Sequence, residues 1–321
     1  MTIQLNDNEF YTGLTNLAIF VKIYSVVNSS KIDDFVAAFR SEPLNYGDTK
    51  IFRSLPMPQV SDYSQNSSVL QVNIASFRNK LTQQDENVAE EKISVNMKKV
   101  IKSTYTRAML ELAVTSEDGA NSFITEVLSN MRAAQSDFLF NSVLDALLAA
   151  PMASETVNLI SPPEGASQVE ETAINIENNK LISLAVQKII DGMQIYTDAY
   201  NRIGLKQSTP LSDLRLVVLQ PYKNQAVLDL FAELLNSSKI NENFPRPELL
   251  TVPEIALTGK AAANNVICFI IHKQFLQVFD KLNISGNFYD PSNLMINNFL
   301  HFWCGIGYLN QLPAVKIVKG A

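Results

Sequence analysis

The C-terminal segment, residues 293–321, constrains the fold more than any other part of this chain. It reads NLMINNFLHFWCGIGYLNQLPAVKIVKGA. Apolar side chains alternate imperfectly along its first half, which favours a strand packed on both faces. Pro313 then interrupts strand pairing, because proline has no N–H to donate, and the apolar run AVKIVKG resumes it. The segment therefore predicts a long buried strand, a turn and a closing strand.

Composition limits the number of domains, the kind of partner and the state of the cysteines. With 321 residues, 46% of them hydrophobic, the chain can build one large or two ordinary domains around a substantial core. Its formal charge of −6 argues against a protein whose main task is to grip nucleic-acid phosphates. Cys268 and Cys304 lie in apolar runs, so we expect inert core thiols and no disulfide framework.

The N-terminal region lacks the signals of export or membrane insertion. The apolar stretch 14–27 is interrupted by Lys22 and is shorter than the roughly 20 residues that span a bilayer. The preceding MTIQLNDNEF has no basic side chain, whereas a signal peptide begins with a basic region. We therefore expect no membrane anchor and no signal that directs the chain out of the cell.

Two alternating segments, 69–75 and 93–106, predict strands that border a charged connection. Before them, a short amphipathic helix is expected near residues 31–40. The charged residues in and beside the connection are Arg78, Lys80, Asp85, Glu86, Glu90, Glu91 and Lys92. They fit either a solvated hairpin tip or a loop that reaches onto a neighbouring subunit.

Two long helices and several strands are predicted in the rest of the chain. Helical spacing from residue 118 to 149 predicts a helix of roughly 50 Å, read as a spine across a sheet in preference to a coiled coil. A second long helix is expected from about Leu181, ending by Arg202 with Gly204 as its C-cap. Strands are expected at 154–160 and 214–219 and in LLTVPEI and VICFIIH; helices are expected from Pro221 and at 273–282.

Signatures of catalysis or cofactor binding are weak in this sequence. It has no phosphate loop of the GxxxxGK form, and Gly305-Ile306-Gly307 sits inside a strand pattern. His272 and His301 have apolar neighbours and no companion at metal-ligand spacing. We therefore assign no catalytic residue, cofactor or metal.

The order of these elements resembles the Hong Kong 97-type capsid fold, an α+β fold of the major capsid proteins of tailed bacteriophages. An arm, a two-stranded extended loop, a long spine helix, a compact mixed domain and closing strands follow one another as in that family. The resemblance implies an N-terminal arm and linker (1–68), an extended loop (69–106), a peripheral domain with the spine helix (107–179), an axial domain (180–287) and the closing strands of the peripheral domain (288–321).

The resemblance also implies a function. The chain would self-assemble into hexamers and pentamers of an icosahedral shell enclosing double-stranded phage DNA, as part of a virion assembled in the bacterial cytoplasm. Its expected partners are further copies of itself, a portal, a separate scaffolding protein and the packaged DNA, held non-specifically; no membrane is involved. The charged residues of the loop would contact neighbouring subunits, and Lys22, Lys31 and Arg132 are candidates for facing DNA. The alternatives are the shell of an encapsulin-like compartment and, less favoured, a cytoplasmic α/β enzyme.

Overall fold

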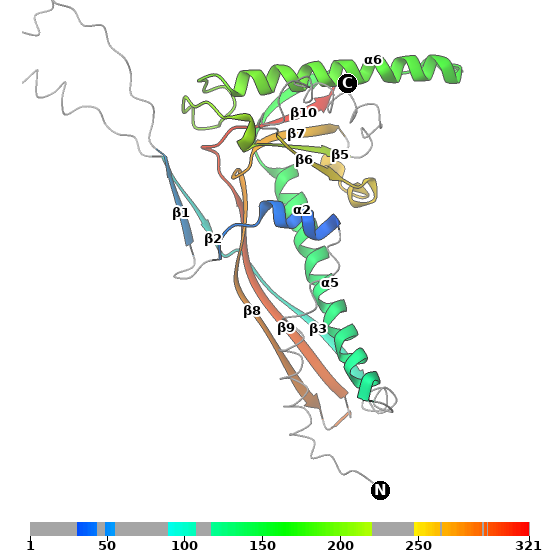
Figure 1. Cartoon of the computed structure of the whole chain (residues 1–321), viewed down its shortest axis with the longest axis vertical. Helices are drawn as coiled ribbons and strands as arrows, with labels where there is room; N and C mark the ends of the chain where they lie inside the picture. The colour runs from blue at the N-terminus through cyan, green and yellow to red at the C-terminus, as the bar shows by residue number, and fades with distance from the viewer. Residues whose placement is uncertain are drawn as a thin grey trace, which may run out of the picture. The chain divides into compact units, whose positions relative to one another are not determined.

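The computed structural model forms two compact units (Figure 1). It describes residues 31–43, 49–54, 89–106, 117–219, 247–263, 265–290, 292–293 and 295–320. One unit contains α2, β3, α5, β8 and β9, and the other contains β4, α6, β5, β6, β7 and β10. The predicted strand at 69–75 and the predicted helix from Pro221 lie outside the described residues.

A long helix lies across a three-stranded sheet in the first unit. The sheet has the order β3 (Met97–Thr106), β9 (Met295–Tyr308), β8 (Leu276–Asp290), and both pairings are antiparallel. Helix α5 (Glu117–Ala149) packs on it, with the ring of Phe138 5.7 Å from that of Phe302. Helix α2 (Lys31–Phe39) packs on α5 through Phe35 and Phe140. The predicted spine helix, its sheet and the short amphipathic helix are therefore confirmed.

The glycines of the Gly-Ile-Gly sequence in β9 make room for neighbouring side chains. A Cβ on Gly305 would collide with the ring of Phe279, and one on Gly307 would lie 2.8 Å from the side chain of Ile93. Asn96 bonds the backbone of Ile306 in both directions, at 2.7 and 3.1 Å, in the break between β2 (Ala89–Ser94) and β3. The predicted single strand 93–106 is therefore two strands, because Asn96 replaces regular pairing with side-chain bonds.

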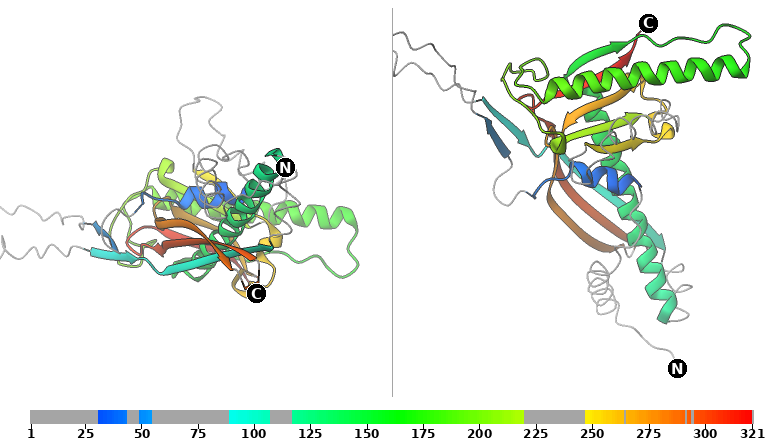
Figure 2. Two further views of the ribbon diagram at one scale, coloured as in Figure 1. Left: turned by 90° about the horizontal axis from the view of Figure 1, so that it is seen from below. Right: turned by 45° about the horizontal axis from the view of Figure 1, so that its top comes forward.

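The second unit is a five-stranded mixed sheet covered by helix α6 (Gln168–Met193) (Figure 2). Its strands have the order β4 (Ala153–Val157), β10 (Ala314–Lys319), β7 (Val266–His272), β5 (Leu214–Leu219), β6 (Glu248–Val252). The β10–β4 and β5–β6 pairs are parallel, whereas β7 runs antiparallel to β5 and β10. Short 3-10 helices occupy Leu211–Asp213, Glu254–Leu257 and Ala261–Ala263. The expected strands are thus present, and the closing strand β10 lies inside this sheet.

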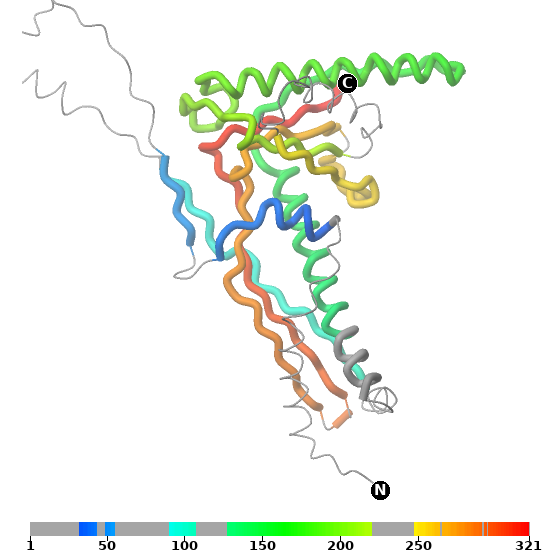
Figure 3. The backbone as a smooth tube through the Cα atoms, in the orientation of Figure 1, coloured from blue at the N-terminus to red at the C-terminus, as the bar shows by residue number. Residues whose placement is uncertain are grey.

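Helix α6 begins at a capping box formed by Ser167 and Glu170. The Ser167 hydroxyl accepts the N–H of Glu170, whose carboxylate accepts the N–H of Ser167 at 2.8 Å. That arrangement satisfies donors left open at a helix start. Its buried side chains all lie between Asn179 and Met193, so the first half projects past the sheet, as the tube drawing shows (Figure 3).

One predicted helix is wrong, and so is the predicted end of another. The helix expected at 273–282 is a turn followed by strand β8, in which Leu276, Val278 and Phe279 are buried. Burial on both faces removes the alternation that marks a strand, so the apolar run has a helix-like spacing. Helix α6 also ends at Met193, well before the expected end, and Gly204 adopts a φ of +76° in the following loop.

Candidate functional site at the loop base

The base of the predicted extended loop is a two-stranded sheet. Strand β1 (Thr49–Ser54) pairs with β2, and residues 55–88 connect them. The sequence analysis placed β1 within the arm and linker, whereas the structure makes it the partner of β2. Of the residues predicted at subunit contacts, Glu90, Glu91 and Lys92 lie on β2. Four others, Arg78, Lys80, Asp85 and Glu86, lie outside the described residues.

Glu90 is held at the surface by two cations. Its carboxylate lies 2.9 Å from Lys92 Nζ and 3.0 Å from Arg53 Nε. The hydrogen bonds from Lys92 and then from Arg53 lower the pKa of Glu90. Such exposed pairs contribute little to stability, because water and salt screen them. Together the three side chains carry a net charge of +1 at the surface of the loop base.

Glu91 has a different environment. Its Oε1 accepts hydrogen bonds from the backbone N–H and the side-chain Nδ2 of Asn310, at 2.9 and 2.8 Å. Its Oε2 accepts the backbone N–H of Gln311 at 3.1 Å. Hydrogen bonds to an ionised acceptor are stronger than neutral ones. Glu91 therefore fastens the loop base to the turn of residues 309–313 between β9 and β10.

The 309–313 turn also forms hydrogen bonds with other segments. Gln311 accepts bonds from the Ser54 hydroxyl on β1, at 3.0 Å, and from the Gln207 side chain, at 2.8 Å. The backbone N–H of Arg202 donates to the carbonyl of Asn310 at 3.0 Å. One short turn thus joins the loop base to the segment that follows α6.

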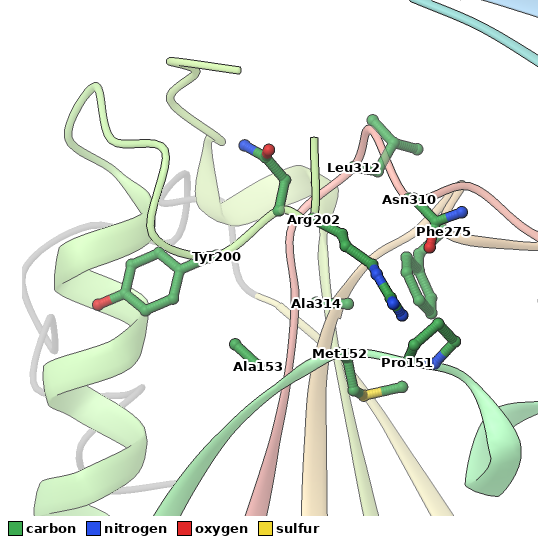
Figure 4. A pocket seen from close by; sticks show the side chains of 10 residues that line it. Pro151, Met152, Ala153, Tyr200, Arg202, Phe275, Asn310, Leu312 and Ala314 are labelled. Carbon is green, nitrogen blue, oxygen red and sulfur yellow. The ribbon is translucent and has the colours of Figure 1, made fainter. Parts of the chain in front are cut away.

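An open cavity of about 300 Å³ lies beside this turn (Figure 4). Part of its wall is apolar, formed by Pro151, Met152, Phe275 and Leu312. The Arg202 side chain extends into it, and Asn310 stands at its edge. Among the described residues, none forms an ion pair with Arg202.

The amide of Asn310 is oriented by Glu91. Since its nitrogen donates to Glu91, its oxygen is turned the other way, toward Phe275 and Arg202 (Figure 4). That oxygen is buried and has no hydrogen-bond partner among the described residues. Leaving a buried acceptor unsatisfied costs about 1–3 kcal/mol.

The residues predicted to face DNA are only partly described. Arg132 lies half-buried on α5, Lys31 is the first residue of α2, and Lys22 lies outside the described residues. Nothing in the structure assigns them to a DNA surface, so their role stays a prediction.

The cysteines and histidines lie away from the cavity wall. Both cysteines are buried and free, and burial raises the pKa of Cys268 to about 12 and that of Cys304 to about 11. Burial lowers the pKa of His272, whose Nδ1 accepts the N–H of Gln274. His301 is exposed, so it faces away from buried Cys304. Inert core thiols are therefore confirmed.

No cluster of three or more histidine, cysteine, aspartate or glutamate side chains among the described residues is arranged to hold a metal ion. Within the same ranges, no helix combines the length and apolar character needed to cross a membrane.

Solved structures place the molecule in the class of α+β phage capsid folds. The capsid structure of Staphylococcus phage Andhra matches with a TM-score of 0.59 at 10% identity, covering 88% of this chain and 83% of that one. The capsid of Cyanophage P-SCSP1u matches with a TM-score of 0.54 at 11% identity, covering 88% and 86%. A chain from Mycobacterium phage Bobi gives 0.51 at 12% identity, covering 92% and 94%. The capsid fold expected from the order of elements is confirmed.

The family follows from the sequence itself. Residues 2–318 match the model of the Phi29-like phage major capsid protein family, and the chain belongs to that family. It is therefore a structural subunit of a multimeric capsid shell and a component of the virion. No curated protein resembles the chain closely enough in sequence to count as a match.

Sequence reasoning missed Arg202 and Asn310. Arg202 was read only as the end of a helix, and Asn310 as part of a turn. Asn310 meets Glu91 across 219 positions of sequence. The only available signal was the polar turn sequence before Pro313, which does not show which segment it binds.

Proposed function

We propose that copies of this chain form the hexamers and pentamers of an icosahedral phage head that encloses double-stranded DNA. The observation that carries the proposal is membership of the major capsid protein family over residues 2–318. An icosahedral shell closes at five-fold rings and a larger one adds six-fold rings, and repeated heterologous contacts build such rings.

The two units suit this role as separate parts of a shell subunit. The unit with the five-stranded sheet and α6 includes most of the predicted axial domain, and the unit with α5 includes the spine helix of the predicted peripheral domain. We propose that axial domains meet around the ring axes while the extended loop, residues 69–106 in the sequence prediction, contacts the neighbouring subunit. The charged loop residues Arg78, Lys80, Asp85 and Glu86 would form that contact.

The remaining partners follow from the same role. Assembly in the host cytoplasm would use a portal and a separate scaffolding protein. DNA would be held non-specifically, because a chain of net charge −6 lacks a strong basic footprint. Lys22, Lys31 and Arg132 remain the candidates for local contact with DNA. An encapsulin-like compartment is the competing kind of shell, and the phage family favours a head over it.

Expression of the chain, alone and with the genes that neighbour it, tests the proposal. Light scattering and negative-stain microscopy should show closed shells, tubes or ring-shaped capsomers. DNA protected from nuclease inside particles made during infection would distinguish a head from a compartment filled with cargo protein. A monodisperse monomer or dimer under every condition would contradict shell formation. It would favour the alternative that the protein is an enzyme.

A further inference from the structure

The first half of helix α6 exposes a stripe of apolar side chains. Val169, Ala173 and Ile176 recur at helical spacing, on a different side of the helix from the buried Ile182 and Val186. Val169 is 79% exposed and Ile176 is 45% exposed. Neighbouring apolar side chains left this open are typical of sites of protein contact. We call the stripe of Val169, Ala173 and Ile176 the α6-start surface.

A second apolar surface lies on the loop that follows α6, residues 194–208, here called the post-helix loop. Ile195 is 68% exposed, Tyr196 is 63% exposed and Ile203 is 43% exposed. Three large apolar side chains on one short loop also suit contact with another protein surface.

Both surfaces are carried on backbone that is already fixed. Thr197 and Gln207 close the post-helix loop through reciprocal backbone hydrogen bonds, each 3.1 Å long. The Asn178 side chain of α6 bonds the N–H and the carbonyl of Ile160, at 2.7 and 2.8 Å, and so ties the preceding segment to the helix. Surfaces that are held in place beforehand lose less entropy when they bind.

The two surfaces lie at opposite ends of one helix (Figure 1). Helix α6 has 26 residues and is therefore about 39 Å long at the standard rise. The α6-start surface occupies its first turns, and the post-helix loop begins directly after its last residue. Two different surfaces at opposite ends of one compact unit cannot meet within one chain. They can meet between copies, and such heterologous contacts close into rings.

The charges of the two ends are complementary. Residues 158–179 contain four glutamates and no lysine or arginine. The post-helix loop contains Arg202 and Lys206 against one acid, Asp198, and neither cation forms an ion pair with a described side chain. Opposite charges orient an interface, whereas contact between two α6 starts would bring glutamates together. Charge therefore favours the post-helix loop of another copy as the partner of the α6-start surface.

We infer that the α6-start surface of one copy docks on the post-helix loop of the next copy, so that subunits join head to tail. This inference rests on the proposed shell function and names the residues of one contact between subunits. Val169 and Ile176 pack against the apolar side chains of the loop. The glutamates beside them face Arg202 and Lys206.

Cysteine cross-linking tests the direction of the contact. Chains carrying only Val169→Cys are assembled with chains carrying only Ile195→Cys, and a short bis-maleimide cross-linker is added. Linked dimers should contain one chain of each kind. A chain carrying both substitutions should give a ladder of linked chains that ends at closed pentamers and hexamers, because the length of α6 prevents a link within one chain. Linked dimers from Val169→Cys alone, or no linkage in the mixture, would overturn the inference.

The native cysteines do not interfere with this reaction. Burial raises the pKa of Cys268 to about 12 and that of Cys304 to about 11, so neither forms the reactive thiolate near neutral pH.

A matched pair of substitutions tests the apolar part of the contact. Val169→Asp should lower the yield of shells or capsomers by about tenfold or more, because it places a charge among apolar side chains. An acid in the first turn suits the helix dipole, so the subunit should still fold. Ile255→Asp is the control, since Ile255 is 85% exposed in the same unit and lies on neither surface. Its yield should stay within about twofold. Equal losses in the two variants, or no loss in Val169→Asp, would contradict the contact.

The results separate failure of the inference from failure of the proposed function. Normal shells from Val169→Asp, without linkage between the two kinds of cysteine variant, would remove this contact and leave the shell role intact. Wild-type protein that never assembles would contradict the shell proposal, and the inference would fall with it.

Discussion

The two long helices of this protein are stabilised in different ways. Helix α5 packs on its sheet and on α2, and its side chains Leu139, Val143 and Leu147 are buried. Helix α6 buries only its second half, and Val169 near its start is 79% exposed. An isolated helix of a few turns is marginal in water, so the start of α6 depends on its cap and on continuity with the packed half. Helix length alone therefore does not show how much of a helix the core supports.

Proline substitutions should give the largest difference in effect between the two helices. Leu128→Pro in α5 should abolish soluble subunit, because an interior proline costs about 3 kcal/mol or more and the packed helix cannot bend away. Ala173→Pro in the exposed half of α6 should leave soluble protein, since the turns before it can unwind without losing buried side chains. Solubility and circular dichroism measure both. Soluble, helical, assembly-competent Leu128→Pro protein would contradict the role given to α5.

A pair of leucine truncations gives the next largest difference. Leu144 in α5 is fully buried, whereas Leu184 in α6 is 62% exposed. Leu144→Ala should lower the free energy of unfolding by about 2–5 kcal/mol, as large cavities in cores do. Leu184→Ala should change it by no more than about 0.5 kcal/mol. Urea unfolding of unassembled subunits gives both values, and similar losses would show that the two helices are supported alike.

Removing the cap of α6 should have a smaller effect. Ser167→Ala deletes the hydroxyl that accepts the Glu170 N–H and should cost about 1 kcal/mol of helix stability. The effect should appear as faster hydrogen exchange across residues 168–178, with little change in the packed half. Ser161→Ala, an exposed serine ahead of the helix, is the control. Unchanged exchange in Ser167→Ala would mean that something other than the cap holds the first half.

The smallest expected effect is a dependence on pH. Burial lowers the pKa of His272 below the ordinary 6.5, and its Nδ1 must stay unprotonated to accept the Gln274 N–H. Below pH 6.5 the unfolded chain therefore binds this proton more readily than the folded one. The stabilisation is present above pH 6.5 and is lost as the pH falls through the lower folded pKa. His272→Gln should flatten this loss in urea titrations, whereas exposed His301→Gln should leave it unchanged; equal slopes in all three proteins would contradict the assignment.

Elements with a clear pattern were predictable from sequence. The spacing of apolar residues located α5, and the continuous apolar runs located β5 and β7. The start of α6 was missed because its first half has no buried stripe, although Ser167 and Glu170 form a capping box that the sequence displays. Strand β8 was taken for a helix because both of its faces are buried at its start.

The candidate site was less predictable than the fold. Acidic residues near β2 were noted, but Glu90 and Glu91 look alike in sequence. One is neutralised at the surface by Lys92 and Arg53, and the other binds Asn310 and Gln311. Only the fold brings positions so distant in the chain together. Reversing both charges in one variant would therefore mix a surface effect with the loss of the bonds that hold the 309–313 turn.

A three-dimensional reconstruction of assembled particles by electron microscopy tests the central claim most directly. The account predicts a closed shell in which this chain occupies both six-fold and five-fold rings. Particles built from one kind of ring only, or protein that never assembles even with its genomic neighbours, would contradict it.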